Sequence, residues 1–209
     1  RQWKQLEKTF LPQCSRVVVV VEEAARRVSD SCPVRPDDLV VVSNTEDAST
    51  LLSEGEPFVD CFPRRWTATY VGGIGPHRGI DTSIRAAAIA GREIPGFQLA
   101  VVGPSELQIP RLERLIHQAG ADDYVTVIRK VPSAKVPAYI RSSEVCLVPH
   151  NDSEHTNTTV PHKLFQYMLL ERPVLVSDCP PLERIVRAAG CGEIFRRNDA
   201  DHMAEQLVK

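Results

Sequence analysis

The residues best suited to chemistry lie in one segment of the chain, Glu154–Asp178, which reads EHTNTTVPHKLFQYMLLERPVLVSD. The segment opens with a polar, hydroxyl-rich loop, and it continues with a short amphipathic helix expected over Val160–Leu170 and a buried strand expected at Val174–Ser177. Thr158 or Thr159 is placed to cap this helix, because a hydroxyl side chain can accept a hydrogen bond from a free backbone N–H of the first turn. The segment therefore predicts a capped helix that follows a polar loop.

The start of this helix gathers groups that bind anions. Pro161 suits the first helical turn, and His162 and Lys163 add side-chain donors beside it. A helix start also carries unpaired N–H groups and the positive end of the macrodipole, which attract phosphate. The combination suits a diphosphate better than a neutral ligand. Capped helices after polar loops also occur without any ligand, so the local pattern leaves both interpretations open.

A second junction of this kind follows the strand predicted at Thr67–Gly72. The turn GIGPHRG, residues 73–79, leads from that strand into a predicted helix. Gly73 and Gly75 let the backbone approach a ligand closely because no Cβ intrudes, and Arg78 could pair bidentately with phosphate oxygens. The turn does not match the GxGxxG pattern, and glycine-rich turns after a first strand are common. An ordinary turn therefore remains the alternative here.

Alternating apolar runs and helical patterns must position these residues. Strands are expected at Val17–Val21, Leu39–Ser43, Thr67–Gly72, Gln98–Val102, Val125–Val131, Val145–Pro149, Val174–Ser177 and Glu193–Phe195. Helices are expected at Glu22–Ser29, Gly79–Ala90, Pro110–Ala119, Val136–Ser142, Val160–Leu170, Pro181–Ala189 and Asp199–Val208. Short, continuous Val/Ile/Leu runs indicate strands buried on both faces, so the pattern predicts an α/β fold with a doubly wound parallel sheet. Ligands of such sheets bind at the carboxyl ends of the strands, where both junctions lie.

Composition and charge exclude several classes of protein. The chain of 209 residues is 43% hydrophobic and 25% charged, which is typical of a globular domain. A formal net charge of −2 argues against a nucleic-acid-binding protein. The six cysteines show neither CxxC pairs nor metal-ligand spacing, so we expect reduced cysteines in a cytoplasmic protein. No apolar run approaches the roughly 20 residues that span a bilayer.

Two strings in the opening segment carry a family resemblance. Pro161–Met168 (PHKLFQYM) and Arg172–Asp178 (RPVLVSD) resemble the donor-site segment of family-four glycosyltransferases of the GT-B architecture. In that family the loop and helix hold the diphosphate and ribose of a nucleotide sugar. The resemblance implies transfer of a sugar from a nucleotide-diphosphate sugar to an acceptor glycan, lipid or small molecule, with retention of anomeric configuration. It implies no metal and no further cofactor.

The resemblance also assigns roles to residues. It implies that Arg78, Lys163 and Glu154 act in catalysis. The residues expected to bind the nucleotide sugar are Gly73, Gly75, Arg78, Gly103, Lys130, Thr158, Thr159, His162, Lys163 and Gln166. Among these, Gly103 belongs to a turn after the strand that ends at Val102, Lys130 lies where the family's chain passes the nucleobase, and Gln166 lies where the family usually binds the ribose.

The chain departs from the family pattern at several positions. The family commonly has two Glu residues across the loop and helix, whereas Thr158 and Gln166 lie near those places here. Gln166 keeps an acceptor oxygen but loses the charge. The family's Arg directly after the first glycine is also missing, and Arg78 lies near the place of its later Lys. These departures keep two alternatives open: a pseudoenzyme that binds a nucleotide or a partner, and a GT-B-fold nucleotide-sugar epimerase.

Three further polar candidates remain. His150 ends a predicted strand and points to the expected crevice, although histidines at strand ends are often structural. Glu183 resembles a family Glu that follows a turn, but a first-turn Glu also simply favours the helix dipole. His155 and His162 with Glu154 imitate a metal site, but their spacing fits no standard pattern.

The acidic, strand-poor stretch before Thr67 divides the chain. We expect residues 1–45 to be the end of an amino-terminal, acceptor-side domain, residues 46–66 a linker and residues 67–209 the donor-binding domain. Both ends look cut from a longer protein, so we expect the chain to be a remnant of one half plus most of the other. Such a piece should bind nucleotide weakly and transfer no sugar, and contact with the inner membrane face is expected only through parts outside it.

Overall fold

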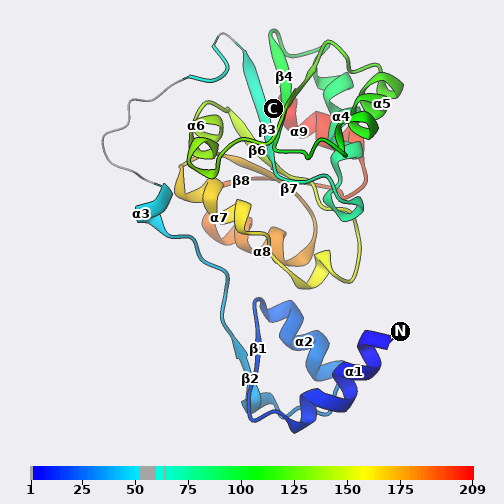
Figure 1. Cartoon of the computed structure of the whole chain (residues 1–209), viewed down its shortest axis with the longest axis vertical. Helices are drawn as coiled ribbons and strands as arrows, with labels where there is room; N and C mark the ends of the chain where they lie inside the picture. The colour runs from blue at the N-terminus through cyan, green and yellow to red at the C-terminus, as the bar shows by residue number, and fades with distance from the viewer. Residues whose placement is uncertain (1, 52–59, 64) are drawn as a thin grey trace.

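The structure is a computed structural model that describes residues 2–51, 60–63 and 65–209. It has a small amino-terminal unit and a larger α/β domain (Figure 1). The amino-terminal unit contains α1 (Gln2–Phe10), β1 (Val17–Val19), α2 (Glu22–Ser31) and β2 (Leu39–Val41). The strands β1 and β2 pair in parallel, with Val17 opposite Leu39. A segment that includes α3 (Ala48–Leu51) runs from this unit towards the larger domain.

The larger domain alternates strands and helices. Its strands are β3 (Trp66–Val71), β4 (Phe97–Val102), β5 (Val125–Ile128), β6 (Val145–Val148), β7 (Val174–Ser177) and β8 (Gly192–Phe195). Its main helices are α4 (Ile80–Ala90), α5 (Ile109–Ala119), α6 (Val136–Arg141), α7 (His162–Leu169), α8 (Pro180–Ala189) and α9 (Ala200–Val208). The strands form one parallel sheet in the order β5-β4-β3-β6-β7-β8. The predicted α/β class and doubly wound parallel sheet are confirmed.

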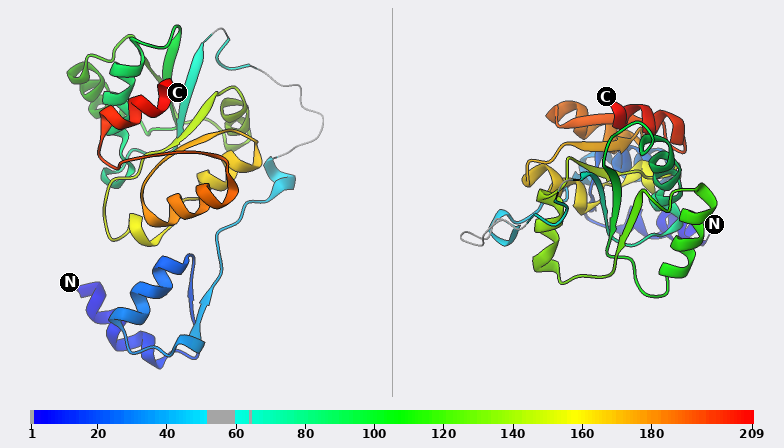
Figure 2. Two further views of the ribbon diagram at one scale, coloured as in Figure 1. Left: turned by 180° about the vertical axis from the view of Figure 1, so that it is seen from behind. Right: turned by 90° about the horizontal axis from the view of Figure 1, so that it is seen from above.

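The two faces of the sheet are covered by different sets of helices. Helices α4, α5 and α9 pack on one face, and α6, α7 and α8 pack on the other (Figures 1 and 2). Every residue of β4, FQLAVV, is buried, and so is every residue of β7, VLVS. A parallel strand between two helical layers has no solvent-facing side, which explains why these strands read as continuous apolar runs.

The strand order reverses between β3 and β6, and this reversal locates the expected crevice. The chain first moves outward through β4 to β5 and then returns to place β6 on the other side of β3. The loops after β3 and after β6 therefore leave the sheet on opposite faces, which is where a ligand crevice is expected in an open parallel sheet. Both junctions singled out in the sequence, residues 73–79 and residues 154–163, lie at this edge of the sheet.

The structure corrects the predicted start of α7. The helix begins at His162, and its N-cap is Pro161, with no side-chain capping hydrogen bond. The prediction that Thr158 or Thr159 caps it was wrong: Thr158 Oγ1 donates to Glu154 O at 2.7 Å within a separate turn, and Thr159 is extended. The physical reason is Pro161, because the residue before a proline is disfavoured in the helical region and the helix cannot extend back through Val160.

Smaller differences concern the ends of elements. The strand β5 ends at Ile128, before the predicted Val131, and α1 was not predicted at all. The domain boundaries at 45 and 66 remain predictions, and residues 52–59 and 64 of the predicted linker lie outside the described residues. Among the helices that the structure describes, none is long and apolar enough to cross a membrane.

Candidate functional site

Two glycines line the crevice where β3 and β4 end. Gly72 has a φ of +119°, and its N–H donates to Val102 O at 2.8 Å. Gly103 repeats this arrangement one strand further along, where its N–H donates to Ile128 O at 2.9 Å. A Cβ added to Gly72 would lie 3.4 Å from Lys163 Nζ, in a backbone conformation that side chains rarely adopt. Gly72 is therefore required chiefly by its backbone conformation, and it brings the main chain close to Lys163.

The loops after β3 and β6 are locked together at Gly79. This residue has a φ of +64° and precedes α4, and an added Cβ would lie only 1.6 Å from Pro149 O. Asn151 joins the same loops, because its N–H donates to His77 O at 3.2 Å and its Nδ2 donates to Pro76 O at 2.8 Å. Only a glycine permits this approach of the two backbones, so the two loops are held in contact at this point.

Lys163 is the most unusual charge in the site. It lies in the first turn of α7, and its Nζ stands 3.7 Å from the centroid of the Tyr70 ring. The Nζ atom is buried and has no hydrogen-bond partner among the described residues. Burial, and then the charge of Arg78, lower the pKa of Lys163 well below its usual value. A buried amine with no counter-ion is costly, so this position is suited to a ligand that brings negative charge.

Three histidines lie beside Lys163 and Arg78. The ring of His77 packs edge-on against those of His155 and His150, with centroids 5.3 and 6.4 Å apart. Both ring nitrogens of His150 are buried without a partner among the described residues, and burial, followed by the charges of Lys163 and Arg78, lowers the pKa of His150 to about 3. The pKa of His77 is lowered by burial and by Arg78.

The charges that perturb this cluster share one sign. Burial is the largest cause of the lowered pKa values of Lys163, His77 and His150, and the positive charge of Arg78 lowers each of them further. A bound anion would oppose these shifts, because an opposite charge nearby favours the protonated form of each group. The electrostatics therefore point to an anionic ligand at the carboxyl ends of β3 and β6.

The predicted glycine-turn residues take their places around this cluster. Gly75 begins the turn after β3, and its carbonyl accepts a hydrogen bond from the Arg78 N–H at 2.9 Å. Gly73 is exposed, and its carbonyl accepts a hydrogen bond from the Tyr70 hydroxyl at 2.6 Å. The structure thus brings Gly73, Gly75 and Arg78 to the same edge of the sheet as Lys163.

The remaining predicted binding residues spread around the crevice. His162 and Gln166 lie on α7 with Lys163, and Thr158 and Thr159 lie in the loop before it. Lys130 is exposed just beyond the end of β5, on the outer side of Gly103. Lys130 is therefore separated from Lys163 by the ends of β3 and β4.

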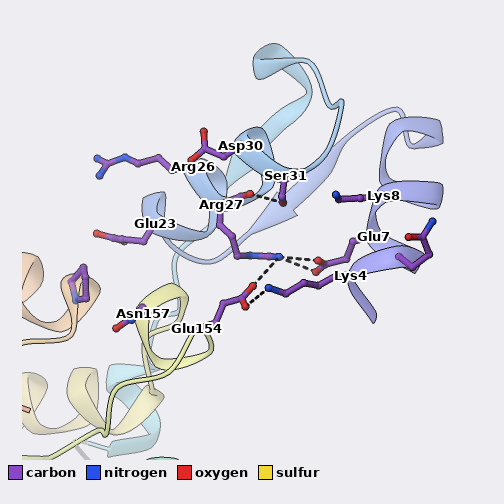
Figure 3. Close-up of a pocket in the computed structure, with 12 residues that line it drawn as sticks. Lys4, Glu7, Lys8, Glu23, Arg26, Arg27, Asp30, Ser31, Glu154 and Asn157 are labelled. Carbon is purple, nitrogen blue, oxygen red and sulfur yellow. Dashed lines mark hydrogen bonds and ion pairs between the residues drawn. The ribbon is translucent and has the colours of Figure 1, made fainter. Parts of the chain in front are cut away.

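Glu154 lies in different surroundings (Figure 3). Its carboxylate pairs with Lys4 at 2.5 Å and with Arg27 at 3.8 Å, both on helices of the amino-terminal unit. The two carboxylate oxygens of Glu7 also bind Arg27, at 2.8 and 2.9 Å. These groups line a cavity of about 920 Å³ between α1, α2 and the loop before α7. The structure places Glu154 in this charged network, and its catalytic role stays a prediction.

Sequence reasoning missed three residues that build the site. Tyr70 lies beneath Lys163, and Gly79 and Asn151 lock the two loops together. The sequence did contain signals for two of them. Gly79 is the last glycine before α4, and Asn151 is a polar residue that follows His150 at the end of a strand. Tyr70 gave no signal, because a tyrosine inside an apolar strand reads as an ordinary core residue. Among the described residues, no group of three His, Cys, Asp or Glu side chains could hold a metal ion.

Comparison with known proteins identifies the family. Residues 60–209 match the family described as glycosyl transferases group 1. The chain belongs to the group 1 glycosyltransferases. These residues include the whole six-stranded sheet and the cluster around Lys163, so the part of the chain that carries the candidate site is also the part that carries the family match.

Individual relatives agree with this assignment. The chain is 26% identical over 220 residues to a D-inositol 3-phosphate glycosyltransferase of Nocardia farcinica, covering 96% of the chain and 46% of that protein. The crystal structure of HepE of Anabaena in complex with UDP and glucose matches with a TM-score of 0.76 and 14% identity, over 98% of this chain and 56% of that one. The carboxyl-terminal domain of LpcC from Francisella tularensis, a group 1 glycosyltransferase, matches with a TM-score of 0.56 and 17% identity, over 68% of this chain and 73% of that one.

These matches also show how much of a relative's length the chain spans. It spans about half the length of the curated relative, and its larger domain has the fold of a GT-B carboxyl-terminal domain. The predicted glycosyltransferase family and the GT-B, Rossmann-like architecture are confirmed.

Proposed function

We propose that this chain is mostly the donor-binding half of a retaining glycosyltransferase, which transfers a sugar from a nucleotide-diphosphate sugar to an acceptor. The observation that carries the proposal is Lys163, whose Nζ is buried beside Tyr70 without a hydrogen-bond partner among the described residues. The similarity to HepE, which was crystallised in complex with UDP and glucose, supports a nucleoside diphosphate as the anion.

In this proposal the diphosphate lies between the glycine turn and the start of α7. The backbone at Gly73 and Gly75 approaches it from one side, and Lys163 and the first N–H groups of α7 approach it from the other. Arg78 and Lys163 then stabilise the negative charge that collects on the leaving diphosphate as the bond to the sugar breaks. Because the fold already positions both side chains in the free protein, little reorganisation is needed in the transition state.

The remaining predicted residues surround that diphosphate. Gln166 takes a ribose hydroxyl through its amide oxygen, and Gly103 and Lys130 flank the nucleobase at the ends of β4 and β5. Thr158, Thr159 and His162 contact the donor from the loop and the exposed start of α7. Glu154 serves the sugar transfer from the side of the amino-terminal unit.

A specific observation favours a second candidate, a nucleotide-binding protein without transferase activity. Thr158 and Gln166 lie near the places where the family resemblance leads us to expect carboxylates. The two candidates differ in one result: a full-length parent that binds the donor but transfers no sugar would support the second. For the chain of 209 residues itself, we expect weak nucleotide binding and no turnover.

Calorimetric titration with UDP, GDP and ADP tests the proposal. We expect one nucleotide to bind, and we expect binding to vanish in an Arg78→Ala/Lys163→Ala double variant. An Arg85→Ala/Lys135→Ala variant is the matched control, because it removes the same charge from an exposed position on α4 and one before α6. If no nucleotide binds to the wild type at millimolar concentration, the proposal fails for this chain.

A further inference from the structure

One side chain, Arg197, ties the loop before α7 to the far edge of the sheet. Arg197 follows β8, and its Nε lies 2.8 Å from Asp178 Oδ1, just beyond β7. Its Nη1 donates to Asp152 Oδ1 and to Asn157 Oδ1, each at 2.8 Å. The backbone N–H of Arg197 also donates to Asp178 Oδ1 at 3.0 Å. One guanidinium therefore joins the segments that follow β6, β7 and β8.

The loop that Arg197 contacts, residues 151–158, also has hydrogen bonds within itself. Asn157 Nδ2 donates to Asp152 Oδ1 at 2.8 Å, which closes the loop into a ring with Arg197 at its base. Inside the ring, Thr156 is fully buried, and its Oγ1 donates to Asn151 O at 2.6 Å. These contacts within the loop act together with those from Arg197 to restrict its conformation.

Both ends of this loop reach the candidate site. At one end, Asn151 binds the carbonyls of the turn after β3, and the His155 ring packs on His77. At the other end, the chain passes through Pro161 into the first turn of α7, where Lys163 lies. The position of the loop thus affects the separation between the glycine turn and the start of α7.

We propose that Arg197 is a positioning residue for the donor site, which acts through Asp152 and Asn157 to hold the loop before α7 in the arrangement that binds the diphosphate. This inference rests on the proposed function. The planar guanidinium suits the role because it presents several donors in a fixed fork, and here it serves three side-chain acceptors at once. A lysine ammonium is a point charge on a flexible stem and would hold fewer of them in place.

The test compares Arg197→Met and Arg197→Lys with Arg196→Met. Arg196 is the matched control, because its Nε pairs with Asp199 Oδ2 at 2.9 Å and its side chain is 65% exposed, away from the loop. Three quantities are measured for each protein: nucleotide affinity by calorimetry, amide hydrogen exchange of residues 151–158 without ligand, and the melting temperature.

We expect Arg197→Met to weaken nucleotide binding about tenfold, the equivalent of one charge-assisted hydrogen bond, and to speed exchange in the loop. Arg197→Lys should restore part of the affinity, and Arg196→Met should bind and exchange like the wild type. A purely structural role predicts a lower melting temperature with unchanged affinity, and that result would overturn the inference.

The exchange measurement separates this inference from the proposed function. A wild type that binds no nucleotide refutes the donor site, and with it the claim that Arg197 serves donor binding. Unchanged loop exchange in Arg197→Met refutes the inference even if the wild type binds nucleotide well.

Discussion

Lys163 and Glu154 belong to one short segment of the chain, yet their surroundings are opposite. The Nζ of Lys163 is buried without a hydrogen-bond partner among the described residues, and the neighbouring charge of Arg78 is also positive. Glu154 is half exposed and pairs with two cations of the amino-terminal unit. Exposed pairs of this kind contribute little to stability, whereas burial without a counter-ion disfavours the protonated form of Lys163 until an anion binds. We therefore expect an anionic ligand on the Lys163 side, whereas the ion pairs of Glu154 join its loop to the amino-terminal unit.

The largest expected effect on stability concerns Gly79, where the two loops beside Lys163 are held together. In Gly79→Ala, the new Cβ must avoid Pro149 O while the backbone keeps a φ of +64°. We expect the free energy of unfolding to fall by about 3 kcal/mol or more, as for other residues at strained, closely packed positions. Gly120→Ala is the control, because Gly120 has a φ of +62° but nothing within 4 Å of an added Cβ. Urea denaturation that gives equal losses for both variants would contradict the locking of the two loops.

The next effect concerns His150 and the dependence of stability on acid pH. The pKa of His150 is about 3 in the folded protein, against an ordinary value of 6.5. The unfolded state therefore binds one more proton between these values, and stability falls as pH decreases from 6.5 towards 3. We expect His150 to contribute a slope of about 1.4 kcal/mol per pH unit in this range.

Denaturation of the wild type and of His150→Gln across this range tests that slope. Removal of the histidine should flatten the pH dependence of the free energy of unfolding, whatever it does to stability at neutral pH. An unchanged slope would show that His150 is not held uncharged by its surroundings.

A smaller effect is expected at Lys163, where substitution should raise the stability of the free protein and not lower it. Lys163→Met replaces an unpaired buried amine with an apolar side chain of similar length, so the free protein should gain about 1–3 kcal/mol of stability. Nucleotide affinity should fall at the same time. Thermal unfolding measures the gain in stability, and calorimetry measures the loss of nucleotide affinity. A purely structural lysine would instead lose stability on substitution.

The smallest effect on stability is expected at Glu154. Glu154→Gln removes ion pairs whose acidic side chain is 50% exposed, and such pairs are worth about 1 kcal/mol or less and weaken with salt. Unfolding in low and high salt should show a small difference between variant and wild type that disappears at high salt. A large, salt-independent loss would contradict the view that these pairs are ordinary surface contacts.

Much of the larger domain could be predicted from local patterns. The runs that became β4 and β7 are buried throughout, so their continuous apolar character was a reliable signal. The two junctions at residues 73–79 and 154–163 were also identified, because glycines, basic residues and a helix start were adjacent in the sequence. The start of α7 was misplaced, since Pro161 ends the extended segment and does not enter the first turn.

The rest depends on contacts that are distant in the sequence. Gly79 is required by Pro149, and Arg197 is positioned by Asp152 and Asp178 from other loops. No local pattern reveals such pairs. The pairing of Glu154 with Lys4 is another contact between residues that are distant in the sequence, so the sequence did not reveal it.

The central claim is that the cluster around Lys163 binds a diphosphate. Calorimetric titration of the wild type and Lys163→Met with UDP, in two buffers of different ionisation enthalpy, counts the protons taken up on binding. The pKa values of Lys163 and His77 are lowered in the free protein, and a bound diphosphate would raise them, so we predict proton uptake by the wild type and less by the variant. Equal affinity of the two proteins, with no proton uptake by either, would contradict the claim.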